Sequence, residues 1–214
     1  MNNLQKRILT ALVVLPISLF FIFVGGYPTL LFLLTIFFVA NYELFSVFKK
    51  KSIILFLDLV LILSLYSIYL LSKYESELLL WIIILVVCSD IGGYVFGKLF
   101  KWKKLTDISP NKTVSGVFGS FIFSLMSPIL YFIITNPFNR SSDDFLEPEY
   151  FFYSLLFSLI AQAGDLTISY FKRLEKIKDA GKILPGHGGI FDRIDGLMFV
   201  SIIAYILIYL RLVG

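Results

Sequence analysis

Seven long apolar runs follow one another along the chain, and they limit its fold more than any other feature. Each approaches the roughly 20 residues that a helix needs to cross a bilayer. The sequence shows no alternating barrel pattern, and a backbone in lipid must satisfy its own hydrogen bonds, so helices are expected. The sequence therefore predicts an all-α, polytopic integral membrane helical bundle of about seven transmembrane helices. The runs cover residues 8–24, 28–48, 52–71, 78–100, 114–135, 150–171 and 190–212.

The composition agrees with a membrane protein and excludes a soluble globular domain. Hydrophobic residues make up 58% of the chain and charged residues 16%, and the mean hydropathy is +0.86. We expect one membrane domain, with amino-terminal helices in residues 1–75 and the chemistry in residues 76–214. Lys6 and Arg7 precede the first run, as in a secretory signal peptide, but no small-residue cleavage site follows, so we expect a retained helix.

Basic residues concentrate in alternate loops. Sixteen of the nineteen Lys and Arg residues lie in the amino terminus and in segments 49–51, 98–112 and 172–193. Because loop Lys and Arg set orientation, we place these segments on the cytoplasmic side of the cell inner membrane. The same charge indicates an anionic partner, although the positive-inside rule and attraction to lipid headgroups explain it equally well. No nucleic-acid partner is expected.

One polar stretch, residues 169–195, separates the last two apolar runs and is where we expect the chemistry. It holds six of the basic residues, four carboxylates and the only histidine, His187. Just before and within it, Asp165, Ser169 and Lys172 or Arg173 recur at helical spacing. The spacing places a carboxylate, a hydroxyl and a cation on one helix face.

Two further carboxylates, Asp192 and Asp195, lie three residues apart at the start of the last run. With Asp165 from the preceding helix they indicate an all-oxygen site for a hard cation, most naturally Mg²⁺. The alternative is that they complement a helix amino terminus, worth under about 1 kcal/mol each. Two other carboxylates in apolar runs receive no role: Asp58 lacks a partner in the sequence, and Glu43 is close enough to a helix end to reach water or the nearby lysines.

The glycine turn that contains Gly188 and Gly189 lets the backbone approach an anion closely, and free amides at a helix start favour phosphate. A second loop places Ser109, Lys112 and Thr113 before another apolar run, where a simple helix cap is the alternative. Basic side chains, a glycine turn and metal-binding carboxylates together are typical of phosphoryl or nucleotidyl transfer. Asp90, followed by several glycines, serves either ligand contact or close helix packing.

These motifs resemble those of the phosphatidate cytidylyltransferases, also called CDP-diacylglycerol synthases. The resemblance covers roughly residues 85–200 and includes Gly164-Asp165, the segment from Ser89-Asp90 to Gly97, and Ser109-Pro110-Asn111-Lys112-Thr113. Ser115 stands where the family usually has glutamate, and the chain has fewer amino-terminal spans than is common in the family. The positions that match the main signature are Ser169, Phe171, Lys172, Arg173, Lys178, Asp179, Gly181, Pro185, His187, Gly188, Gly189, Asp192, Arg193 and Asp195.

The resemblance implies transfer of CMP from CTP to phosphatidic acid, giving CDP-diacylglycerol and pyrophosphate in phospholipid biosynthesis. It assigns Mg²⁺ to Asp165, Asp192 and Asp195, and it suggests a second, monovalent cation, K⁺, and a homodimer. Lys172 and Arg173 would hold phosphate groups, and His187 would act as an acid or hydrogen-bond within its turn. The residues expected to bind substrate are Ser109, Asn111, Lys112, Thr113, Ser169, Lys178, Lys182, Gly188, Gly189 and Arg193.

Two rival functions stay open at this point. A CTP-dependent kinase of a polyprenol-like alcohol shares the metal, nucleotide and membrane requirements, but a neutral alcohol needs a general base. An ion-coupled transporter also carries carboxylates within its helices. The polar residues gather at one face of the expected bundle and show no inverted repeat, which argues against the transporter.

Overall fold

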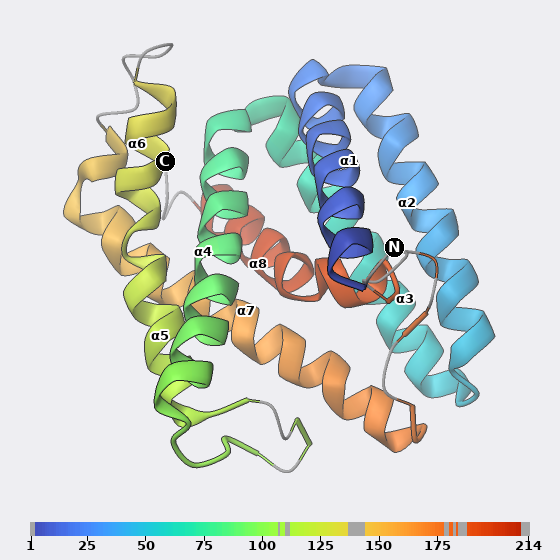
Figure 1. The fold of residues 1–214 in the computed structure, drawn as a ribbon. Helices are drawn as coiled ribbons and strands as arrows, with labels where there is room; N and C mark the ends of the chain where they lie inside the picture. Colours follow the sequence, from blue (N-terminus) through green and yellow to red (C-terminus); the bar gives the residue numbers. More distant parts are fainter. Residues whose placement is uncertain are drawn as a thin grey trace. The chain divides into compact units, whose positions relative to one another are not determined.

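The computed structural model describes residues 3–106, 108–109, 112–136, 144–177, 180–181, 183 and 188–210, with side chains from residue 12 onward except at residue 15. The described residues form eight helices (Figure 1). These are α1 (Asn3–Val24), α2 (Gly26–Val47), α3 (Lys51–Tyr74), α4 (Ser76–Phe100), α5 (Val114–Ser124), α6 (Ser127–Thr135), α7 (Pro148–Leu174) and α8 (Phe191–Tyr209).

The helices confirm the predicted polytopic membrane bundle. Each of the seven apolar runs contains a helix, and the run at 114–135 contains two, α5 and α6. Pro128 lies in the first turn of α6, and its missing N–H cannot continue the hydrogen bonding of α5. Five segments are long and apolar enough to cross a membrane: α2, α3, α4, α5 with α6, and α7. The first turns of α8 carry three charged residues, Asp192, Arg193 and Asp195.

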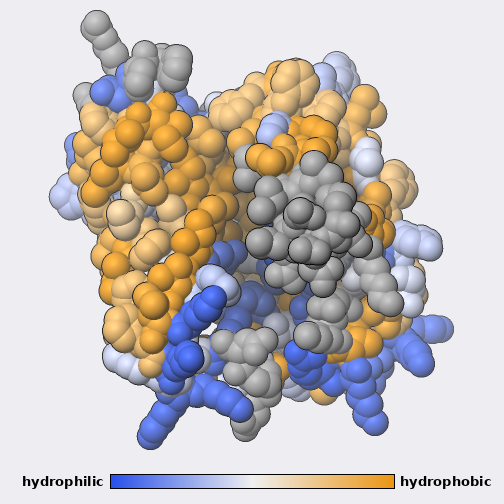
Figure 2. Space-filling view, in the orientation of Figure 1, coloured by the Kyte–Doolittle hydropathy of each residue, from blue (hydrophilic) through white to orange (hydrophobic). Residues whose placement is uncertain are grey.

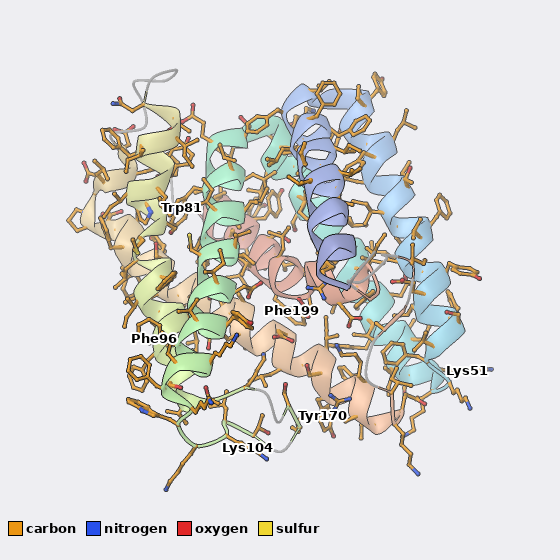
Figure 3. The ribbon with its side chains drawn as sticks, viewed as in Figure 1. Lys51, Trp81, Phe96, Lys104, Tyr170 and Phe199 are labelled. Carbon is orange, nitrogen blue, oxygen red and sulfur yellow. The ribbon has the colours of Figure 1, made fainter. Side chains whose placement is uncertain are left out.

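The chain divides into two compact units. The first unit comprises Met1–Ser76 and Phe171–Gly214, and so contains α1, α2, α3, α8 and the last turn of α7. In it α3 packs against both α2 and α8, and α2 packs against α1. Leu44, Leu57 and Leu61 are fully buried in this packing. Three consecutive lysines, Lys49, Lys50 and Lys51, lie where the turn after α2 leads into α3; Figure 3 labels Lys51.

The second unit, Glu77–Tyr170, contains α4, α5, α6 and most of α7. Helices α4 and α5 approach closely because Gly92 faces Gly119, and a Cβ added at Gly92 would overlap the Gly119 carbonyl. Small residues at such a contact are what lets membrane helices pack backbone to backbone. Ser89 of α4 joins this packing to α7, since its Oγ lies 2.8 Å from the Oγ of Ser158.

The surface of each unit suits a lipid environment. In the second unit, apolar side chains cover α4 to α6, and hydrophilic side chains gather at the loop that follows α4 (Figure 2). In the first unit, large apolar side chains such as Leu31 and Phe38 are about two-thirds exposed, at 65% and 67%. Exposed apolar surface of this extent is a liability in water and is expected where acyl chains cover it.

Candidate functional site

Asp192, at the start of α8, organises the described part of the polar stretch in the first unit. Its Oδ1 lies 2.6 Å from the Nζ of Lys172, and both side chains are only 9% exposed. Its Oδ2 accepts hydrogen bonds from the backbone N–H groups of Ala180 at 2.8 Å and Gly189 at 3.3 Å. A buried charge is tolerated when it is paired and hydrogen-bonded in this way. The Asp192 carboxylate thus connects the end of α7, at Lys172, to the backbone at Ala180 and at Gly189.

Glu43, on α2, is a second carboxylate of this region, and the sequence did not assign it a role. It is 1% exposed. Its Oε2 accepts from the backbone N–H of Ile190 at 2.8 Å and of Phe191 at 3.4 Å, and its Oε1 accepts from Ile183 at 3.4 Å. Glu43 is thus buried against backbone N–H groups, and it contacts neither water nor the lysines at 49–51. The expectation that it reaches water or pairs with those lysines was wrong. The only signal in the sequence was a carboxylate in an apolar run.

The expected stripe along α7 is partly present. The Oγ of Ser169 donates to the Oδ1 of Asp165 at 3.3 Å, as the i, i+4 spacing indicates. Lys172, one turn later, pairs with Asp192. Arg173 is exposed, and its Nη1 donates to the carbonyl of Ile177 at 2.7 Å. Ser169, Lys172 and Arg173 therefore each have a different partner.

A cavity of about 290 Å³, lined by both polar and apolar side chains, lies in the second unit. Lys112 and Asp165 face each other there, with Nζ to Oδ2 at 2.6 Å, and their side chains are 24% and 37% exposed. Glycine backbone forms part of the wall at Gly93 and Gly116, which lie against each other. The polar residues that line the cavity are Asp90, Ser109, Lys112, Thr113, Ser120, Gln162 and Asp165.

The loop before α5 holds Lys112 in this cavity. The Lys112 carbonyl accepts from the N–H of Leu105 at 2.8 Å, and the N–H of Val114 donates to the carbonyl of Lys103 at 3.0 Å. Thr113 caps α5, because its Oγ1 accepts from the N–H of Gly116 at 3.1 Å. The capping role considered for Thr113 is thus confirmed, and the same residue still lines the cavity.

The remaining predicted residues are distributed unevenly. Ser109 and Asp90 line the cavity. Ser115, at the family's glutamate position, is 1% exposed, and its Oγ lies 3.0 Å from Thr113 Oγ1. The Oδ1 of Asp195 accepts from the N–H of Gly196 at 2.9 Å, and Arg193 lies in the first turn of α8. Gly188 has φ 89°, a conformation that favours glycine. Asn111, Lys178, Lys182 and His187 lie outside the described residues.

Carboxylate and hydroxyl oxygens such as those of Asp165, Ser169 and Asp192 are of the kind that hard cations take as ligands. Among the described residues, however, no three His, Cys, Asp or Glu side chains come together as a metal site. The oxygens of Asp165 are engaged by Lys112 and Ser169, and those of Asp192 by Lys172 and two amides. The geometry of the described residues alone therefore does not define a metal site, and the assignment of Mg²⁺ to these aspartates stays a prediction.

Comparison with known proteins gives consistent matches. The model of the cytidylyltransferase family matches residues 54–211. The phosphatidate cytidylyltransferase of Helicobacter pylori is 35% identical over 147 residues, which cover 68% of this chain and 52% of that protein. Proteins of the same name from Staphylococcus aureus and Staphylococcus saprophyticus are 44% and 43% identical, over 57% of this chain and 45% of theirs. The chain spans about half the length of the curated relatives it matches.

Proposed function

Because this chain belongs to the cytidylyltransferase family, we propose that it transfers CMP from CTP to phosphatidic acid. The relatives compared above are named for that activity, as phosphatidate cytidylyltransferases. The observation that carries the proposal is the partly exposed Lys112–Asp165 pair in a cavity that several other polar side chains also line. Its volume of about 290 Å³ is at the lower end for ligand pockets, so we propose that it holds part of the nucleotide, the phosphates.

The chemistry of the cavity supports this assignment. A lysine that is 24% exposed can exchange its bond to Asp165 for a phosphate oxygen, since a partly exposed ion pair contributes little by itself. Gly93 and Gly116 let the backbones of α4 and α5 approach closely beside the cavity. The hydroxyls of Ser109 and Thr113 supply further hydrogen bonds to phosphate oxygens.

The proposed reaction balances without a strong base. A phosphate oxygen of phosphatidic acid attacks the α-phosphorus of CTP, the bond from that phosphorus to the bridging oxygen breaks, and pyrophosphate leaves. A phosphate monoester has a second pKa of about 6, so near neutral pH the nucleophile is already largely a dianion. What the protein must supply is position and neutralisation of repelling charges, which Lys112 and the basic residues of the polar stretch provide.

We assign the remaining roles by the family resemblance. Asp165, Asp192 and Asp195 would hold Mg²⁺, which supplies charge neutralisation on the triphosphate, and K⁺ would be a second cation. Arg173 and Lys172 would bind phosphate, and Lys172 also fixes the carboxylate of Asp192. The residues of 76–214 would carry the catalysis, and two copies of the chain would form a homodimer.

The protein is a multi-pass membrane protein, and we propose that its amino terminus and basic loops face the cytoplasm. The single native cysteine, Cys88, is buried, so a cysteine introduced at Lys104 can be labelled selectively. In sealed right-side-out vesicles, a membrane-impermeant maleimide should label Glu147→Cys and leave Lys104→Cys unlabelled until the vesicles are opened. The opposite pattern would reverse the proposed orientation.

The function is tested with purified protein in detergent micelles, phosphatidic acid, Mg²⁺ and CTP labelled at either the α- or the γ-phosphate. We expect α-label in the lipid product and γ-label in pyrophosphate. Lys112→Met should lower turnover by about 100-fold, because one preorganised cation is lost from the phosphates. The matched control is Lys104→Met, which removes an exposed lysine of the same loop (Figure 3) and should retain wild-type turnover.

Each rival function gives a different result in that assay. Transfer of γ-label to a lipid alcohol would identify a kinase and overturn the proposal. Absence of nucleotide turnover with any lipid or cation would also overturn it and favour a transporter. An equal decrease in turnover in Lys112→Met and Lys104→Met would contradict the proposal that the cavity binds the nucleotide phosphates, even if wild type forms the lipid product.

A further inference from the structure

Glu43 lies outside the part of the chain that the family model matches, which begins at residue 54. Its side chain nevertheless contacts the described part of the signature stretch, at Gly181, Ile183, Gly189 and Ile190. Glu43 and all four of these residues belong to the first unit. A residue of the amino-terminal helices therefore shapes a segment that carries the family's signature.

The contacts of Glu43 account for its burial. A carboxylate that is 1% exposed in a membrane-spanning helix is costly unless its charge is compensated. Ile190 and Phe191 stand at the start of α8, where backbone N–H groups lack partners within the helix and carry partial positive charge. Ile183 donates to the other oxygen. The carboxylate thus joins the start of α8 to a residue seven positions before Ile190.

Two glycines of the signature stretch leave room for this carboxylate. A Cβ added at Gly181 would overlap Oε1 of Glu43, and one added at Gly189 would lie 2.7 Å from Oε2 and 2.8 Å from the N of Gly181. The φ angles of these two residues are not positive, so backbone conformation does not require glycine there. Glycine is required because the Glu43 carboxylate lies where a Cβ would be.

The same segment also holds Asp192. Gly189, which lies against Glu43, donates its N–H to Asp192 Oδ2, and so does Ala180, the neighbour of Gly181. A shift of the backbone at Gly181 would therefore displace the Ala180 N–H, and a shift at Gly189 would displace its own N–H, which are two hydrogen-bond donors to Asp192. Glu43 and Asp192 hold this backbone from two directions.

We propose that Glu43 is a positioning residue: it fixes the backbone at Gly181 and Gly189 and through it the carboxylate of Asp192. This inference rests on the proposed function only where it concerns turnover. The effect on the backbone is independent of any reaction, so the two can fail separately.

The first test is hydrogen exchange, followed by mass spectrometry, on the full chain in detergent micelles. Glu43→Gln keeps the shape but turns one acceptor into a donor that faces N–H groups. We expect amides in 183–191 to exchange on the order of ten- to a hundredfold faster, as for loss of hydrogen bonds to a charged acceptor. The matched control is Glu175→Gln, in the same unit, whose Oε1 accepts from the N–H of Lys50 at 2.9 Å. It should leave exchange in 183–191 unchanged.

Turnover supplies the second readout. With CTP and phosphatidic acid, Glu43→Gln should lower kcat about tenfold or more and change KM for CTP less, because misplacement affects the transition state most. Glu43→Asp, which keeps the charge, should recover part of kcat. If wild type turns over no CTP, the proposed function fails while the exchange result still decides the role of Glu43.

A double-mutant cycle completes the test. Gly181→Ala alone should lower kcat and speed exchange in 183–191, whereas in a Glu43→Ala background it should add little, because the overlapping side chain is gone. Additive effects would overturn the proposal. So would unchanged exchange in Glu43→Gln, or faster exchange spread evenly over the whole chain, which would indicate only a general loss of stability.

Discussion

Two lysine–aspartate pairs, one in each unit, share the same geometry and differ in their surroundings. Lys172 with Asp192 and Lys112 with Asp165 both have Nζ at 2.6 Å from a carboxylate oxygen. The first pair is 9% exposed on both sides, and Asp192 also accepts two backbone hydrogen bonds. The second pair is 24% and 37% exposed and lines a cavity.

The difference shows how burial decides what an ion pair does. Removing one partner of a buried pair leaves a charge that nothing solvates, so the first pair stabilises the surrounding backbone in addition to the binding roles proposed for it. A pair that water reaches contributes between about 0 and 1 kcal/mol, so its lysine is free to bind another anion. Substitutions that separate stability from activity test this difference, and we consider them from the largest expected loss of stability to the smallest.

The largest loss is expected for Lys172→Met, which leaves Asp192 buried without its cation. We expect a decrease of about 3–5 kcal/mol in the free energy of unfolding, the usual result of breaking a buried pair. It can be measured by tryptophan fluorescence during thermal or denaturant unfolding in detergent. The double variant Lys172→Met with Asp192→Leu should recover part of the loss. Wild-type stability in the single variant would mean that the two pairs do not differ as proposed.

A smaller loss is expected for Gly92→Ala, because the second unit depends on close helix packing where the first depends on its buried pair. The new Cβ would overlap the Gly119 carbonyl, and such overpacking typically costs about 1–3 kcal/mol. Gly93→Ala is the comparison, since its Cβ would meet a side-chain atom, the Oγ of Ser120, at 2.7 Å; turning this Oγ away costs about one buried hydrogen bond, the one to the Ser89 carbonyl, or roughly 1 kcal/mol. Equal unfolding midpoints for the two variants would contradict this account of the α4–α5 contact.

Ser158→Ala should lower stability by about 1 kcal/mol, the typical contribution of one buried hydrogen bond. It removes the buried partner of Ser89 in the packing of α4 against α7, and also the longer, part-buried bond at 3.3 Å that Gln162 Nε2 donates to Ser158. The same unfolding measurement applies, with Thr167→Ala as control, because Thr167 sits on the same helix and bonds only the carbonyl of Ala163 in an exposed position. A loss as large as that of Lys172→Met would show that the second unit also depends on a single polar contact.

The smallest loss is expected for Lys112→Met, the same substitution at the more exposed pair. The unfolding free energy should change by less than about 1 kcal/mol. The strong decrease in turnover proposed for this variant should therefore occur in a protein of normal stability. Unfolding as extensive as that of Lys172→Met would assign both pairs the same structural role.

Hydropathy was sufficient to predict the helices, because a chain in lipid has few other ways to satisfy its backbone. The break between α5 and α6 was not predicted. Pro128 marks it, yet Pro16 lies inside α1 without ending that helix, so proline alone does not determine where a membrane helix stops.

The residues of the candidate site were easier to predict than their partners. The helical spacing of Asp165 and Ser169 led directly to their hydrogen bond. Spacing contains no information about which lysine meets which aspartate across different helices, and neither pair was predicted. Glu43 shows the same limit, because its partners are backbone N–H groups, which every residue except proline carries.

The link between Glu43 and the start of α8 also has a consequence for how the protein is made. Its three N–H partners follow it by 140 to 148 residues. At about 5–20 residues per second, synthesis reaches them roughly 7–30 s after Glu43. During that interval these hydrogen bonds do not exist, so water or a proton must compensate the charge of the carboxylate. The contacts that bury Glu43 can therefore form only after the ribosome has made the start of α8.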